Sequence, residues 1–144
     1  PQNPKTPVCW YIFFYQKMIK LNSGHDCPTF GLGTYKIESQ ETIVHAVRDL
    51  GYRMIDTASF YKNEGMVGNA LKEIATSVKR EDIFVVSKVW WDEVEDVASA
   101  CKRSLSKLGL EYLDLYLIHW PVAMKDNGDG SYSRLKLPMY KIWS

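Results

Sequence analysis

Strand-like and helix-like patterns alternate along most of this chain. Apolar residues recur at the spacing of one helical face over 43–50, 67–74 and 94–108. Short apolar runs stand between these stretches, and IFVV at 83–86 is typical of a buried parallel strand because it is rich in β-branched residues. Strands that alternate with helices in this rhythm predict βα units and a parallel sheet.

Capping signals set the expected bounds of the helices. Ser39 is a favourable N-cap, and Gly51 suits the left-handed residue that follows a helix end. Asp92 with Glu95 three residues later forms a capping box, and Gly109 ends the helix that this box opens. The expected strands are 29–32, 52–55, 83–86 and 112–118, followed by a polar, glycine-rich loop at 125–134 and a helix that begins near Pro138.

A parallel sheet of this kind is either open or closed into a barrel. An open dinucleotide-binding sheet carries G-x-G-x-x-G after its first strand. The first glycine turn here, GLGTYK at 31–36, lacks the third glycine, so a (β/α)8 TIM barrel is favoured. A barrel needs eight βα units and usually about 250 residues. This chain of 144 residues is therefore expected to supply about the first four βα units.

Charge and cysteine content argue against several classes of protein. Eighteen basic and seventeen acidic residues give a net charge of +1. Without a basic stripe, the sequence predicts no nucleic-acid or membrane partner. The apolar run Val8–Tyr15 is too short for a bilayer, which needs about twenty residues. Cys9, Cys27 and Cys101 have neither zinc-site nor dithiol spacing, which favours free thiols and a cytoplasmic location and predicts no metal.

Ionisable side chains stand where three of the expected strands end. Asp56 follows YRMI, Lys88 follows IFVVS and His119 follows LYLI, while Tyr61 lies in the loop after Asp56. The carboxyl ends of the strands of a βα-barrel converge on one mouth, where chemistry takes place. Each residue alone is more often a turn, solvent-facing or packing residue. Together, at the same level of successive units, they indicate a shared site.

These four side chains suit acid–base chemistry at a carbonyl group. A nearby ammonium stabilises a phenolate and so lowers the pKa of a tyrosine, and a carboxylate holds that ammonium in place. An imidazole can donate a hydrogen bond that orients a carbonyl oxygen. Neither an activated nucleophile nor a flanking pair of carboxylates is evident. Carbonyl reduction therefore suits the set, and its hydride must come from a cofactor.

Four motifs, in order, resemble the signatures of the aldo-keto reductase superfamily, in particular its aldose and aldehyde reductase members. They are GLGTYK, GYRMIDTASFYKNEGMVGNAL, VVSKVWW and YLDLYLIHWP. The resemblance makes 18–144 the N-terminal half of a reductase barrel, an incomplete domain. Residues 1–17 are then an extraneous or disordered extension, or alternatively a genuine aromatic-rich N-terminus.

The resemblance implies a catalytic tetrad and an NADPH cofactor. Tyr61 would be the general acid, Lys88 paired with Asp56 would assist its proton transfer, and His119 would orient a small-molecule carbonyl substrate. The implied cofactor contacts are Gly33, Thr34, Tyr35 and Asp56, and the implied substrate contacts are Tyr35, Phe60, Trp90, His119 and Trp120.

Two alternatives to a reductase remain open at this point. The chain could instead be a non-catalytic relative, with a structural or regulatory role, or a truncated gene product. The residues that separate NADPH from NADH are expected in later strands, and no motif names the aldehyde or ketone. A full-length parent is expected to be monomeric. The 144 residues alone are expected to be inactive and to self-associate, because half a barrel exposes unpaired strand edges.

Overall fold

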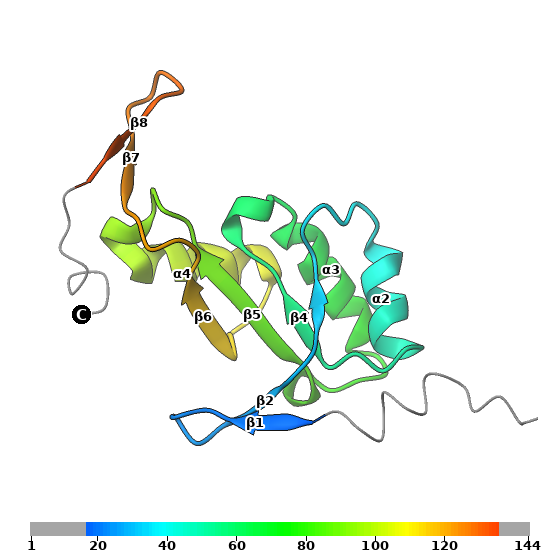
Figure 1. The fold of residues 1–144 in the computed structure, drawn as a ribbon. Helices are drawn as coiled ribbons and strands as arrows, with labels where there is room; N and C mark the ends of the chain where they lie inside the picture. Colours follow the sequence, from blue (N-terminus) through cyan, green and yellow to red (C-terminus); the bar gives the residue numbers. More distant parts are fainter. Residues whose placement is uncertain (1–16, 136–144) are drawn as a thin grey trace, which may run out of the picture.

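The computed structural model describes residues 17–135. A parallel sheet with the strand order β3-β4-β5-β6 lies at its centre (Figure 1). The order of the strands follows the chain, so the predicted succession of βα units is confirmed. The strands are β3 (Leu32–Gly33), β4 (Met54–Asp56), β5 (Phe84–Val89) and β6 (Leu115–Ile118).

The strand β6 begins three residues later than the sequence predicts. The carboxylate of Asp114 accepts a hydrogen bond from the backbone N–H of Val85 at 2.8 Å, and it also accepts one from Arg80 at 2.8 Å. The side chain of Asp114 thus accepts the hydrogen bond from the N–H of Val85 that a backbone carbonyl of β6 would otherwise accept. The strand ladder starts only after Asp114, and the segment 112–114 is held by this ion pair.

Three helices cover one face of the sheet: α2 (Gln40–Arg48), α3 (Glu64–Ile74) and α4 (Val97–Leu108) (Figure 1). The packing of α3 on α4 needs a glycine at position 68, because a Cβ there would lie 2.5 Å from the carbonyl oxygen of Leu108. The fully buried residues between helices and sheet include Ile43, Val47, Ile55, Val67, Ile74, Val85 and Leu108.

The end of α2 differs from the prediction. Ser39 is the N-cap, although its side chain makes no capping hydrogen bond, and Gly51 has the expected left-handed φ of 77°. The helix ends at Arg48, so Leu50 lies beyond it and is exposed. Leu50 continues the apolar spacing in the sequence, but the chain has already turned away from the helical face.

The capping box predicted at Asp92 and Glu95 is wrong. α4 begins at Val97, and its N-cap is Asp96, whose Oδ1 accepts a hydrogen bond from the N–H of Ser99 at 3.0 Å. A 3-10 turn, Val94–Asp96, precedes the helix and delays its start. The acidic run offers several carboxylates, and only the structure shows which one caps. Gly109 ends the helix with φ 66°, as predicted.

Two antiparallel hairpins flank the sheet, and neither was predicted from the sequence. β1 (Met18–Lys20) pairs with β2 (Asp26–Pro28), and β7 (Met124–Asp126) pairs with β8 (Tyr132–Arg134). The second hairpin occupies the predicted polar loop together with Met124, and it extends away from the sheet (Figure 1). Cys9 and the helix expected near Pro138 lie outside the described residues.

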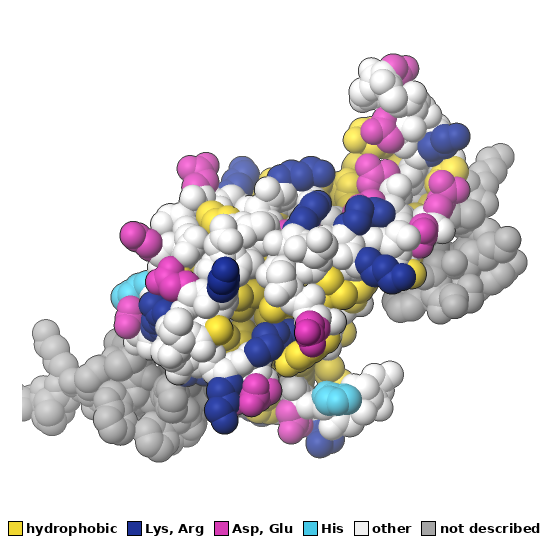
Figure 2. Space-filling view, turned by 180° about the vertical axis from the view of Figure 1, so that it is seen from behind, with side chains coloured by type: hydrophobic (Ala, Val, Ile, Leu, Met, Phe, Trp, Pro, Cys, Tyr) yellow, Lys and Arg dark blue, Asp and Glu magenta, His cyan; other side chains and the backbone are white. Residues whose placement is uncertain are grey.

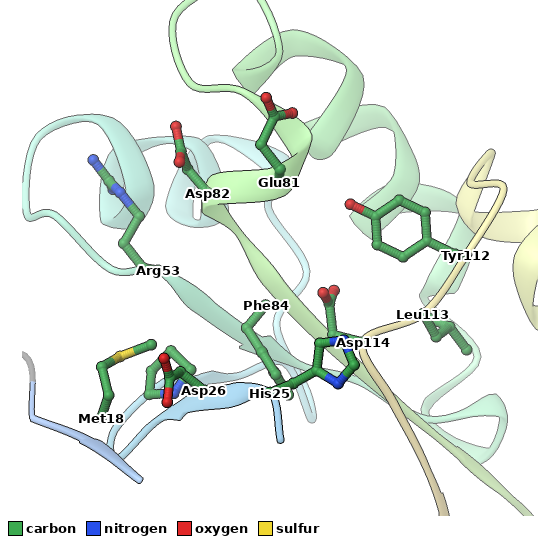
Figure 3. Close-up of a pocket in the computed structure, with 11 residues that line it drawn as sticks. Met18, His25, Asp26, Arg53, Glu81, Asp82, Phe84, Tyr112, Leu113 and Asp114 are labelled. Carbon is green, nitrogen blue, oxygen red and sulfur yellow. The ribbon is translucent and has the colours of Figure 1, made fainter. Parts of the chain in front are cut away.

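The hairpin β1–β2 covers the end of the sheet at which the strands begin. Cys27 packs on Phe84 and Val86, which point to the face opposite the helices. A groove of about 810 Å³ opens between this hairpin and the start of β5 and β6. Arg53, Asp82 and Asp114 line it (Figure 3). This groove is at the opposite end of the strands from Asp56, Lys88 and His119.

The surface carries charges of both signs. Lys and Arg side chains are interspersed with Asp and Glu side chains on the face drawn in Figure 2. Within residues 17–135, none of the helices has the length and apolar character that a bilayer crossing requires.

Candidate active site

The four predicted catalytic residues meet at the carboxyl ends of the strands. Asp56 is the last residue of β4, Lys88 is the last but one of β5, and His119 directly follows β6. Tyr61 ends a 3-10 turn, Ser59–Tyr61, that follows β4. The parallel register, in which Asp56 pairs with Val86, brings the ends of neighbouring strands to one level. The expected convergence is therefore present in the structure.

Lys88 joins three of the groups at this site. Its Nζ donates to Oδ1 of Asp56 at 2.5 Å, to the carbonyl oxygen of Thr57 at 2.9 Å and to the hydroxyl of Tyr61 at 3.3 Å. An ammonium has three N–H donors, so these acceptors use all of them. With 12% of its side chain exposed, Lys88 is fixed between a carboxylate and a phenol.

The alternation of side chains along β5 explains why Lys88 faces the site. Val86 and Lys88 point to one face of the sheet, and Val85 and Ser87 point to the helices. On the helical side, Oγ of Ser87 donates to Oε1 of Glu64 at 2.8 Å. Glu64 is only 2% exposed, and Lys107 Nζ lies 3.9 Å from its Oε2. The strand is thereby anchored from behind, directly beside Lys88.

His119 is held by its backbone and by aromatic rings. The backbone N–H of His119 donates to the carbonyl oxygen of Val89 at 3.1 Å. The imidazole lies edge-on to the ring of Tyr61, at 5.6 Å between centroids, and to that of Trp90, at 4.9 Å. Within the described part of the chain, its Nδ1 is buried without a hydrogen-bond partner. The position of the ring is fixed, and Nδ1 makes no hydrogen bond within the described residues.

The environment keeps the imidazole of His119 neutral. Burial lowers its pKa from the ordinary value, and the positive charge of Lys88 lowers it further, while Asp56 acts in the opposite direction. A histidine has an unperturbed pKa near 6.5. The lowered pKa means that at neutral pH one ring nitrogen carries a proton and the other is free to accept.

Aromatic residues form one wall of the site. Phe60 stacks on Trp90 with centroids 3.9 Å apart, and Tyr35 lies 6.4 Å from Phe60 and 5.1 Å from Tyr61. Four of the five predicted substrate residues, including His119, are therefore neighbours. Trp120 is 52% exposed, and no ring contact within the described residues links it to this group.

The first-strand turn lies beside Asp56. Gly33 pairs with Asp56 in the sheet, and both the N–H and the hydroxyl of Thr34 donate to the carbonyl oxygen of Asp56, at 2.9 and 3.0 Å. Asn63 fixes the other side of the turn through a hydrogen bond to the carbonyl oxygen of Thr34 at 2.8 Å. A Cβ at position 33 would meet nothing within 4 Å, so a ligand can approach this backbone.

Sequence reasoning missed the residues that support the site. Ser59 and Glu93 form a partly buried hydrogen bond, and the carbonyl oxygen of Thr57 binds Lys88. A backbone acceptor leaves no signal in a sequence, and Glu93 stands in the acidic run DEVED, which resembles a solvated surface. No cluster of three or more potential metal ligands occurs in residues 17–135.

Comparisons with known proteins agree with this geometry. A profile of the aldo/keto reductase family matches residues 29–143. Methylglyoxal reductase DkgA of Salmonella typhimurium is 46% identical over 112 residues, which are 76% of this chain and 40% of that protein. Aldo-keto reductase family 1 member A1-A of Danio rerio is 51% identical over 112 residues, which are 73% of this chain and 35% of that protein.

Solved structures show the same arrangement of strands and helices. Aldose reductase from Schistosoma japonicum matches with a TM-score of 0.78 and 38% identity, over 88% of this chain and 46% of that chain. An aldo-keto reductase from Bombyx mori, in complex with NADP, matches with a TM-score of 0.77 and 37% identity, over 88% and 44%.

These matches confirm the predicted fold class. The parallel sheet and its covering helices are part of a (β/α)8 barrel. The chain spans about two fifths of the length of the curated relatives that it matches. By its sequence and by its fold, the chain belongs to the aldo/keto reductase family.

Proposed function

We propose that this site provides the acid–base half of an NADPH-dependent reduction of aldehydes or ketones to alcohols, with Tyr61 as the general acid. One observation carries the proposal: the single ammonium of Lys88 contacts both the carboxylate of Asp56 and the hydroxyl of Tyr61. A lysine held in this way favours loss of the phenolic proton, because its charge stabilises the phenolate that remains.

The proton moves from Tyr61 to the oxygen of the substrate carbonyl. Negative charge develops on that oxygen as its carbon receives hydride, and the phenolic proton neutralises the charge. The phenolate left behind lies 3.3 Å from the Nζ of Lys88. Asp56 holds the ammonium in place beside Tyr61 through its own ion pair with Lys88. In the reverse direction, the same phenolate removes the proton of the alcohol.

His119 orients the carbonyl in this proposal. A neutral imidazole donates one hydrogen bond without competing with Tyr61 as a proton source, and the lowered pKa of His119 supports that state. Its ring stands edge-on to Tyr61, so both can reach one oxygen atom. The wall of Tyr35, Phe60 and Trp90 suits the apolar part of a small carbonyl compound. Trp120 is proposed as a further substrate contact.

The nicotinamide cofactor supplies the hydride when it is bound. Residues of the chain fit such a ligand: the backbone at Gly33 is open to approach, and Tyr35 is more than half exposed. Thr34 ties this turn to Asp56. Gly33, Thr34, Tyr35 and Asp56 would form one side of the cofactor site. The solved relative that contains NADP supports the assignment of NADPH rather than NADH.

A chimera tests the proposal. The segment of this chain that matches the Salmonella methylglyoxal reductase replaces the corresponding 112 residues of that enzyme. We expect the chimera to oxidise NADPH in the presence of methylglyoxal. A Tyr61→Phe exchange should lower kcat at least about a hundredfold, because the general acid is lost. Tyr112→Phe, an exposed tyrosine outside the site, is the matched control.

The chimera also separates the proposal from a non-catalytic role. A folded chimera without turnover, or one whose turnover does not depend on Tyr61, would contradict the proposed function. The 144-residue chain alone is expected to oxidise no NADPH with an aromatic aldehyde. It is also expected to self-associate, because one edge of β6 is unpaired within the described residues. Size-exclusion chromatography checks the association.

A further inference from the structure

We propose that Glu93 is a positioning residue that sets the place of Tyr61 at the site. This inference rests on the proposed function, because it assigns Glu93 a part in the reaction of Tyr61. Glu93 lies in the loop between β5 and α4 and does not itself contact Lys88, Asp56 or Tyr61. It acts through the turn Ser59–Tyr61.

Glu93 connects three segments of the chain. Its Oε2 accepts a hydrogen bond from Oγ of Ser59 at 2.7 Å and one from the backbone N–H of Trp90 at 3.4 Å. Its Oε1 accepts one from Arg103 of α4 at 2.9 Å. The carboxylate thus joins the turn after β4, the loop after β5 and a helix on the outside of the sheet.

The position of Ser59 decides where Tyr61 lies. Ser59 is buried and begins the 3-10 turn that Tyr61 ends, and its Oγ also lies 3.3 Å from the carbonyl oxygen of Lys88. The N–H of Tyr61 is bound to the carbonyl oxygen of Ala58 at 3.0 Å, so the turn moves as a unit. A shift of Ser59 therefore changes the contact of 3.3 Å between Tyr61 and Lys88.

The carboxylate of Glu93 also binds the two segments that carry Phe60 and Trp90 of the aromatic wall. Phe60 follows Ser59 and stacks on Trp90, whose backbone N–H is bound to Glu93. Both partners of the stack are therefore tied to one side chain. A reacting group displaced by about 1 Å can lose roughly a hundredfold in rate, so a contact that fixes both segments bears on catalysis.

Capping of the following helix does not explain Glu93. The N-cap of α4 is Asp96, which binds Ser99, and Glu95 is exposed in the same acidic run. Burial alone would raise the pKa of Glu93, but hydrogen bonds from Ser59, Arg103 and the Trp90 backbone bring that pKa below its ordinary value. The carboxylate stays ionised next to Arg103, as a charged anchor requires.

NMR spectroscopy of the 144-residue chain tests whether Glu93 sets the position of the turn that carries Tyr61. The ring protons of His119 report on the rings of Tyr61 and Trp90, which lie edge-on to it. We expect the NMR shifts of these protons to change in Glu93→Ala and in Ser59→Ala, and to stay unchanged in Glu95→Ala. Glu93→Gln, which keeps the size of the side chain and one acceptor, should restore most of the shift. Unchanged His119 shifts in folded Glu93→Ala would overturn the proposal.

A double-mutant cycle in the chimera tests the catalytic part. Glu93→Ala and Ser59→Ala should each lower kcat about tenfold with little change in KM, and the double variant should lose no more than either one, because both act through one contact. Losses that multiply, or a change in KM alone, would overturn the proposal. If the unmodified chimera shows no turnover that depends on Tyr61, the proposed function fails, while the His119 shifts still decide the role of Glu93.

Discussion

The two neighbouring strands β5 and β6 have different environments. β5 pairs with β4 on one side and β6 on the other, and five of its six residues are buried. β6 is at the edge of the sheet, and none of its four residues is fully buried. Yet LYLI is more apolar than FVVSKV. The burial of a strand's residues in this sheet therefore depends on the position of the strand and not on its composition alone.

The difference extends to the functional side chains that the strands carry. Lys88, on β5, donates to three acceptors and lies on a strand that Glu64 anchors from the helical side. His119, after β6, has a buried Nδ1 without a partner in the described part of the chain. The inner strand thus carries a cation that is held by three acceptors, whereas the edge strand is followed by an imidazole with one unpaired nitrogen.

Removal of the cation on β5 should have the largest effect. In the chimera, Lys88→Met should lower kcat roughly a thousandfold, about 4 kcal/mol of transition-state stabilisation, because Tyr61 loses its stabilising charge. Steady-state NADPH oxidation measures the loss. Lys102→Met, at an exposed position of α4, should leave the rate unchanged. A loss below about tenfold for Lys88→Met would mean that the anchored ammonium is not needed.

Truncation of apolar side chains on the two strands should have unequal effects on stability. Val85 on β5 is fully buried, so Val85→Ala should lower the free energy of unfolding by about 2 kcal/mol. Leu117 on β6 is 39% exposed. Although Leu117→Ala removes more atoms than Val85→Ala, it should lower the free energy of unfolding by less than about 1 kcal/mol. Urea unfolding of the 144-residue chain, at a concentration at which size-exclusion chromatography shows a monomer, measures both values. Equal costs would show that the β6 edge is covered in solution.

The titration of His119 should show the smallest effect. NMR should give His119 a pKa below that of an unperturbed histidine, because burial and Lys88 both lower it. The unfolded chain then binds the proton more readily, so the contribution of His119 to the free energy of unfolding is constant above about pH 6.5 and falls as the pH drops from there to the folded pKa. In Lys88→Met the pKa of His119 should rise part of the way toward the ordinary value of a histidine, because one of its two lowering causes is removed. No rise would show that burial alone sets it.

The order of the elements could be predicted because it depends on local patterns. The apolar spacing of residues 67–74 and the β-branched run at 83–86 determine a helix and a strand at those places. The capping residue of α4 and the two hairpins could not be predicted in the same way. Several carboxylates in DEVED satisfy a capping pattern, and the hairpin β7–β8 consists mostly of polar residues without the alternation that marks a half-buried strand.

The candidate site was predictable to the extent that it follows strand ends. Asp56, Lys88 and His119 each stand where an apolar run stops, and parallel strands bring such positions together. The supports of the site were not predictable. Ser59 and Glu93 lie 34 residues apart, and neither is at a strand end. Their pairing depends on how two loops pack, which a local pattern does not encode.

The alternating units, their parallel order and the set of a carboxylate, an ammonium, a phenol and an imidazole at one end could all be derived from the order of the residues. These follow from hydrophobic periodicity and from the direction in which parallel strands run. Only the tertiary structure decided that Lys88 binds Asp56, Thr57 and Tyr61 together, and that Glu93 ties the turn of Tyr61 to Trp90. Such contacts join residues distant in the chain, so they exist only once the helices and strands have packed.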